Sequence, residues 1–111
     1  MNDTEKFLFD LQGFLKVPEF LSLPEVQALN DAFDANEDKR GEDGNQNIGA
    51  SKTLGGRPRG MFTGMLEWEK PHCLPFRDLL AHRKLIPHLD TLFGRGWKMD
   101  HSPCMLCGGR G

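Results

Sequence analysis

Apolar side chains recur at helical spacing in four stretches of this chain. In the first stretch Phe7, Leu8 and Leu11 fall on one face of a helix over residues 4–11. Gly13 follows at the position where a left-handed residue commonly ends a helix. The pattern therefore predicts a short N-terminal helix.

The second stretch carries the clearest helix signal in the sequence. Ser22 and Glu25 have the spacing of a capping box, in which the hydroxyl accepts from a first-turn amide and the carboxylate reaches back. Pro24 is tolerated in the first turn of a helix. The apolar face that follows is marked by Val26, Leu29 and Phe33. These residues predict an amphipathic helix over residues 22–36.

Two further helices are predicted to begin at prolines. Pro75 opens the first of them, and Pro87 lies in the first turn of the second. The apolar residues of this pair are Phe76, Leu79, Leu80, Ile86, Leu89, Leu92 and Phe93. Gly94 is the predicted C-terminal stop of the second helix.

Three segments have the composition of strands. Residues 14–17 form a short apolar run that ends at Pro18, which has no backbone donor for a sheet ladder. Residues 61–68 form a second candidate strand, and residues 97–107 form a third, extended one. We thus expect two or three strands beside a mostly helical remainder.

Residues 37–60 differ from the rest of the chain. They are rich in glycine, charged residues, asparagine and glutamine, and they contain almost no large apolar side chains. This composition predicts an exposed, mobile loop. A lid over a substrate is the alternative interpretation.

The composition is that of one small globular domain spanning residues 1–111, with 38% hydrophobic and 27% charged residues. The 14 basic and 16 acidic residues are spread along the chain and give a net charge of -2, which predicts neither nucleic-acid nor anionic-membrane binding. The acidic, polar N-terminus is unlike a secretory signal, and no segment has the length of a membrane span. A soluble cytoplasmic protein with three reduced cysteines is expected.

Cys104 and Cys107 form a CxxC motif, which raises a zinc or redox module as one hypothesis. His72, Cys73 and His101 are the residues that could complete a zinc tetrahedron. The motif lies in a predicted strand, where residues three apart face opposite sides of a sheet. Buried or half-buried free thiols are therefore the preferred interpretation.

His88 and Asp90 spell the HxD pair of a two-histidine, one-carboxylate iron site. They lie inside a predicted helix, where positions two apart project about 200° from each other. No histidine follows His101, so a distal second histidine is missing. We therefore interpret the pair as a solvated helix face, with Asp90 engaged in a local interaction.

His101 is the histidine expected to face an interior. In an extended segment it shares one face with Trp97, Met99 and Met105. A histidine in the core or in a wall is one interpretation. A pocket-lining position near a cofactor is the other.

The order of these motifs resembles that of a known family. Residues 9–22 (FDLQGFLKVPEFLS), followed by the capped helix, resemble the opening of the phytanoyl-CoA dioxygenase family. Residues 75–82 (PFRDLLAH), 85–89 (LIPHL) and 92–101 (LFGRGWKMDH) resemble the family's helical pair and its first long strand. The resemblance covers most of the chain outside residues 37–60.

The resemblance implies an α+β fold made of the N-terminal helices and first strands of a double-stranded β-helix, or jelly-roll, domain. In the family this domain holds Fe(II) through HxD and a distal histidine, binds 2-oxoglutarate, and hydroxylates a small-molecule substrate. None of those ligands has a counterpart here, so no catalytic or metal-binding residue is assigned. Met99, His101 and Met105 are the residues expected to form part of the pocket wall.

A jelly roll requires about eight strands, more than this sequence supplies. We therefore expect an incomplete fragment of an Fe(II)/2-oxoglutarate oxygenase that binds no cofactor and is inactive alone. Its open strand edge is expected to favour self-association. A small protein-interaction module without catalysis is the alternative function.

Overall fold

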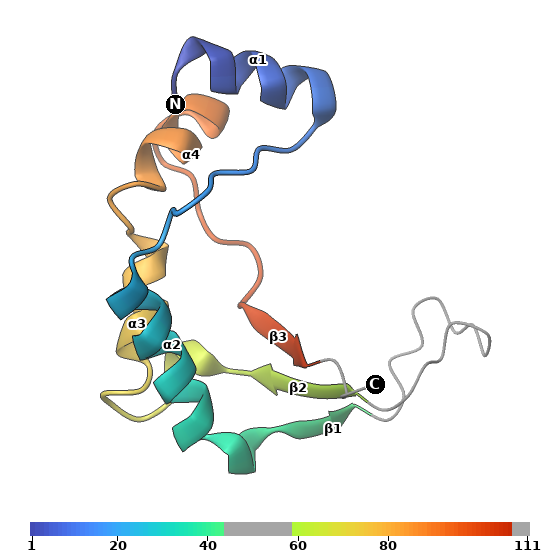
Figure 1. Cartoon of the computed structure of the whole chain (residues 1–111), viewed down its shortest axis with the longest axis vertical. Helices are drawn as coiled ribbons and strands as arrows, with labels where there is room; N and C mark the ends of the chain where they lie inside the picture. The colour runs from blue at the N-terminus through green and yellow to red at the C-terminus, as the bar shows by residue number, and fades with distance from the viewer. Residues whose placement is uncertain (44–58, 108–111) are drawn as a thin grey trace, which may run out of the picture.

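The computed structural model describes residues 1–43 and 59–107, and Figure 1 shows the arrangement of their elements. The helices are α1 (Asp3–Gln12), α2 (Leu23–Ala35), α3 (Leu74–Leu80) and α4 (Ile86–Phe93), with two 3-10 turns, η1 (Glu37–Lys39) and η3 (Met65–Glu67). The strands are β1 (Gly41–Asp43), β2 (Arg59–Thr63) and β3 (Cys104–Cys107). The assignment to a jelly roll stays a prediction.

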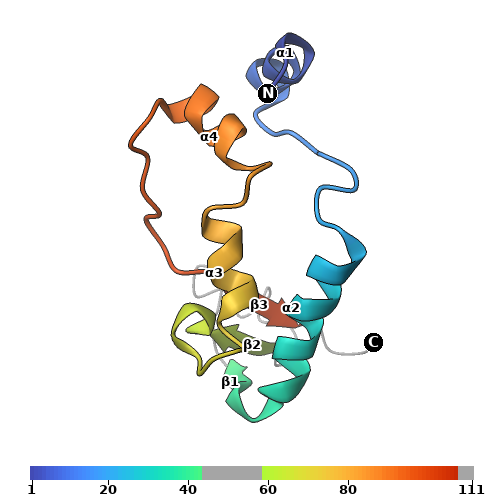
Figure 2. The same ribbon diagram turned by 90° about the vertical axis from the view of Figure 1, so that its left-hand side faces the viewer.

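The three strands form one antiparallel sheet in the order β1-β2-β3. Met61 of the central strand lies opposite Gly41 on one side and Leu106 on the other. Figure 2 shows α2 and α3 beside this sheet, with α1 and α4 grouped at the far end of the molecule.

Local signals specify the predicted helices, and all four are confirmed. In α1 the backbone amide of Glu5 donates to Asn2 Oδ1 at 2.8 Å, and the backbone amide of Asn2 donates to Glu5 Oε2 at 2.9 Å. Gly13 then ends the helix with a φ of 78°, a left-handed conformation that costs glycine little. In α2 the predicted capping box is present, because the Ser22 amide donates to Glu25 Oε2 at 2.7 Å.

The predicted strands are only partly correct. Residues 14–17 form no strand, because none of the segments in residues 1–43 and 59–107 pairs with them. The strand predicted over residues 61–68 ends at Thr63, because Gly64 adopts a φ of 71° and turns the chain into η3. Within residues 97–107 only β3 is a strand.

The length of β2 explains the short third strand. Thr63 pairs with Cys104, and β2 ends there, so residues 97–103 have no ladder partner. The loop predicted over residues 37–60 is also wrong in part, since it contains η1, β1 and the start of β2. Its central residues 44–58 lie outside the described part of the chain.

The core lies between α2, α3, η3 and the sheet. Its buried apolar residues are Ala32, Phe62, Met65, Trp68, Cys73 and Phe76. The half-buried Phe33 ring contacts Phe62 and Phe76 with centroids 5.0 and 5.1 Å apart. Phe76 in turn meets Trp68 edge to face at 5.6 Å, a favourable geometry for aromatic pairs.

One polar side chain is buried beside this core. Asn36 is 2% exposed, and its Nδ2 donates to the Ala32 carbonyl at 2.7 Å. Its Oδ1 accepts from Lys39 Nζ, which also lies 5.3 Å from the Trp68 ring centroid. Asn36 thereby joins the end of α2 to η1 with its amide satisfied.

Candidate functional site

A cavity of about 380 Å³ lies beside α3, α4 and the chain that follows them. Its lining is almost entirely apolar and consists of Phe76, Leu79, Leu80, Leu85, Leu89, Phe93, Trp97, Lys98, Met99, His101 and Pro103. Such a volume and lining are typical of small-molecule sites in proteins. This cavity is the candidate functional site.

The cavity is formed where two short helices, α3 and α4, are joined by a turn. Helices α3 and α4 contribute three of the four leucines, and residues 81–85, which turn the chain between the two helices, contribute Leu85. Trp97 is held to α4, because its Nε1 donates to Asp90 Oδ1 at 3.0 Å. This bond confirms the predicted local interaction of Asp90. It also fixes the start of the segment 97–103, which lies along the cavity.

Two of the three predicted wall residues line this cavity. Met99 and His101 are among its lining, while the Met105 side chain lies outside the described part of the structure. The expectation that His101 faces an interior is wrong, since its side chain is 90% exposed and Nδ1 lies 2.7 Å from Asp100 Oδ2. The reason is that residues 97–103 lack the strand that would turn alternate side chains inward.

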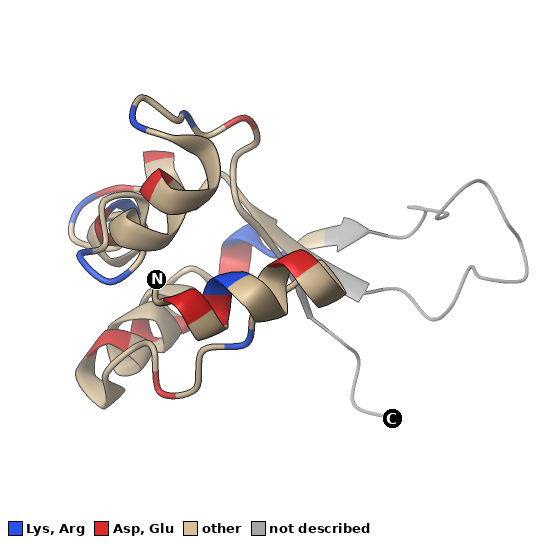
Figure 3. Cartoon of the chain, turned by 90° about the horizontal axis from the view of Figure 1, so that it is seen from above, with Lys and Arg blue, Asp and Glu red and all other residues tan. Residues whose placement is uncertain are grey.

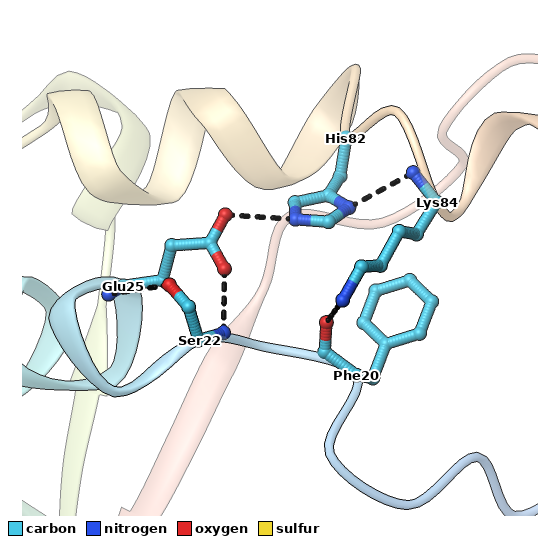
Figure 4. A network of polar contacts seen from close by, with 5 residues as sticks. All are labelled: Phe20, Ser22, Glu25, His82 and Lys84. Carbon is cyan, nitrogen blue, oxygen red and sulfur yellow. Dashed lines mark hydrogen bonds and ion pairs between the residues drawn. The ribbon is translucent and has the colours of Figure 1, made fainter.

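The buried histidine is His82, which the sequence did not single out. Its side chain is 7% exposed and lies at the end of α3 (Figure 4). The Lys84 amide donates to His82 Nδ1 at 3.2 Å, so Nε2 carries the proton and donates to Glu25 Oε1 at 2.9 Å. His82 therefore ties α3 to the start of α2.

Glu25 is held as a carboxylate by this arrangement. The pKa of Glu25 is lowered from its ordinary value of 4.5 to about 2, chiefly by the Ser22 amide and then by the His82 hydrogen bond. The same joint holds the segment before α2, because Lys84 Nζ donates to the Phe20 carbonyl at 2.8 Å. The Phe20 ring also lies 5.0 Å from the His82 ring.

Ser22, Glu25 and His82 have the residue types of a catalytic triad but not its geometry. The Ser22 hydroxyl accepts from the Glu25 amide at 3.3 Å, while both His82 nitrogens are occupied by Glu25 and Lys84. The histidine has no free nitrogen to take the serine proton. These three residues therefore link α2 to the end of α3 and have no catalytic arrangement. Glu25 and His82 also line a second cavity of about 300 Å³, together with Asp78.

The HxD letters do not form an iron site. His88 Nδ1 donates to the Lys84 carbonyl at 2.9 Å, and Asp90 accepts from Trp97, so the two side chains do not converge. The interpretation as a solvated face is nevertheless wrong for His88, whose side chain is 18% exposed. Its Nε2 is buried without a hydrogen bond and lies 3.7 Å from Glu5 Oε2 on α1.

The expectation of buried or half-buried thiols is confirmed for Cys73 and wrong for Cys104. Cys73 is fully buried in the core, whereas Cys104 on β3 is exposed, and the Cys107 side chain is not described. Within residues 1–43 and 59–107 no three His, Cys, Asp or Glu side chains are grouped to hold a metal ion. The zinc hypothesis therefore receives no support from the described residues.

Comparison with protein-family models, curated proteins and solved structures returned no match. None of the helices in the described part of the chain has the length and apolar character required to cross a membrane. Figure 3 shows acidic and basic positions interspersed along the described elements. The cavity and its lining are thus the features on which a functional proposal rests.

Proposed function

We propose that this chain is the N-terminal portion of a phytanoyl-CoA dioxygenase-like Fe(II)/2-oxoglutarate oxygenase, in which α3, α4 and residues 97–103 form one wall of the substrate pocket. The observation that carries the proposal is the apolar cavity, whose lining includes Met99 and His101. These two residues belong to the segment that resembles the family. The order of helices in the sequence supports the same assignment.

The iron of such an enzyme finds no set of ligands among the described residues. No group of three ligands is present among them, and His88 and Asp90 are engaged elsewhere. We therefore assign no ligand and no chemical step to this chain. The contribution proposed for it is to bind the apolar part of a substrate and to exclude water from that part.

The nucleotide sequence after the codon for Gly111 tests the proposal. An in-frame His-X-Asp followed by a distant histidine is expected. A protein extended through these residues should form succinate from 2-oxoglutarate in the presence of Fe(II), while the 111-residue chain should form none. Succinate formation by the 111-residue chain, or a reading frame without the triad, would contradict the proposal.

A protein-interaction module is the second candidate function. In the described part of the structure β3 pairs with β2 on one side only, which leaves its other edge open for another strand. A second copy of the chain would add to this edge through backbone hydrogen bonds.

Sedimentation velocity over a range of concentrations tests the strand edge. The wild-type chain should associate, and Cys104→Lys should shift it to monomer because an edge lysine opposes pairing. Ser102→Lys is the matched control, since it adds the same charge just outside β3. Equal association of the two variants would exclude this edge as the interface.

A further inference from the structure

We infer that the cavity beside α3 and α4 binds a small aromatic carboxylate. The inference rests on the same cavity as the proposed function and specifies the class of molecule that the cavity accepts. The cavity walls and the charges around them support it, and it requires no iron site.

The walls favour a flat apolar body. Three of the lining residues are aromatic, namely Phe76, Phe93 and Trp97, and four more are leucines. Aromatic rings gain from offset or edge-to-face contacts beyond the area that they bury. The Trp97 N–H is already satisfied by Asp90, so the indole requires no hydrogen bond from a ligand. A volume of about 380 Å³ accommodates a fused two-ring system.

The charges around the cavity favour one negative group. Lys98 lines the cavity and makes no ion pair within the described residues, and no aspartate or glutamate lines the cavity with it. His101, the other polar lining residue, is already paired with Asp100. A carboxylate near Lys98 would therefore meet an uncompensated ammonium group at the rim of an apolar cavity.

Calorimetric titration at pH 7 with 2-naphthoate, its neutral isostere 2-naphthamide, and decanoate tests both elements of this inference. We expect 2-naphthoate to bind with one site per chain. The amide should bind about two- to five-fold more weakly, the range of an exposed ion pair. Decanoate should bind more weakly than 2-naphthoate, because an alkyl chain lacks the ring contacts.

Two variants locate the site. Lys98→Gln should weaken 2-naphthoate binding to the level of the amide and leave the amide unaffected, whereas Lys16→Gln, outside the cavity, should change neither. Leu89→Ser should weaken both naphthalene ligands about tenfold through lost apolar contact. Circular dichroism of each variant verifies that it is folded.

Three outcomes would overturn the inference. These are no binding of 2-naphthoate at millimolar concentration, equal binding of the acid and the amide, and insensitivity of 2-naphthoate binding to Lys98→Gln. A fourth result would also overturn it: loss of self-association in sedimentation by Leu89→Ser with unchanged 2-naphthoate binding, which would identify the cavity as a protein interface. The oxygenase proposal is tested by the reading frame after Gly111 and by succinate formation. A failure of ligand binding would therefore not decide it.

Discussion

The two ends of the molecule contrast in how their apolar residues are used. At the sheet end, six apolar side chains, Phe62 and Phe76 among them, are buried where α2, α3, η3 and β2 meet. At the other end (Figure 1), α1 and α4 bury none completely. Phe7, Leu11 and Phe93 are 63, 71 and 71% exposed. The comparison shows that a helix specified by local signals need not be part of a core.

The reason lies in the range of the interactions that form each end. The box of Asn2 and Glu5 and the stop at Gly13 are complete within α1 itself. The sheet end depends on contacts between distant segments, such as Phe33 with Phe62. Short isolated helices are marginal in water, so α1 depends on contacts such as that between Glu5 and His88 to remain docked.

The largest expected effect tests the core. Phe62→Ala should lower the free energy of unfolding by about 3 to 5 kcal/mol, because a 1% exposed aromatic ring is lost from packed surroundings. Phe14→Ala, at a 62% exposed position, should change it by less than about 0.5 kcal/mol. Urea denaturation followed by circular dichroism measures both.

Phe62→Leu serves if the alanine variant does not fold, with an expected loss of about 1 to 2 kcal/mol. Similar losses for the Phe62 and Phe14 variants would show that the two ends do not differ in packing.

A smaller effect is expected at the polar group beside the core. Asn36→Ala should cost about 1 to 3 kcal/mol, because it leaves the Lys39 ammonium without its acceptor and the Ala32 carbonyl without its donor. Asn30→Ala on the exposed face of α2 is the matched control and should stay within about 0.5 kcal/mol. Equal urea midpoints for the two alanine variants would show that the hydrogen bonds of Asn36 do not stabilise the sheet end.

The smallest effect is a dependence on pH at the junction of the two ends. Because the pKa of Glu25 is lowered from 4.5 to about 2, its contribution to stability is present above pH 4.5 and is lost as the pH falls toward 2. Glu25→Gln retains a side-chain oxygen for the Ser22 amide but removes the charge. The variant should therefore be less stable at pH 7 and should lose less stability on acidification.

Urea midpoints measured between pH 7 and pH 2 provide the readout for Glu25→Gln. Glu69→Gln, at an exposed position, is the control and should follow the wild-type curve. Parallel curves for all three proteins would mean that the Glu25 carboxylate is not stabilised by folding.

The helices could be predicted from the sequence because their signals are local. The capping box of Ser22 and Glu25 predicts the start of α2 from four consecutive residues, and Gly94 predicts the end of α4. Strands could not be predicted equally well, since a strand requires a partner elsewhere in the chain. Residues 14–17 have strand composition but no partner in the described part of the chain, and β3 is only as long as the part of β2 that it meets.

The same distinction explains what was found of the candidate site. The resemblance alone names Met99 as a residue of the oxygenase pocket wall; Met99 lines the cavity beside α3 and α4, and its role in such a pocket stays a prediction. His82 was missed, because its partner Glu25 lies 57 residues away and no spacing rule connects them. The capping box did identify Glu25, but only in its role within α2.

The sequence distance between Glu25 and His82 also has a consequence for synthesis. At about 5 to 20 residues per second, a ribosome needs about 3 to 11 s to add the 57 residues that separate them. During that interval α2 can close its own first turn, but α3 has not yet been made to cover Phe33. Phe33 of α2 therefore has no Phe76 ring to pack against until synthesis has passed α3.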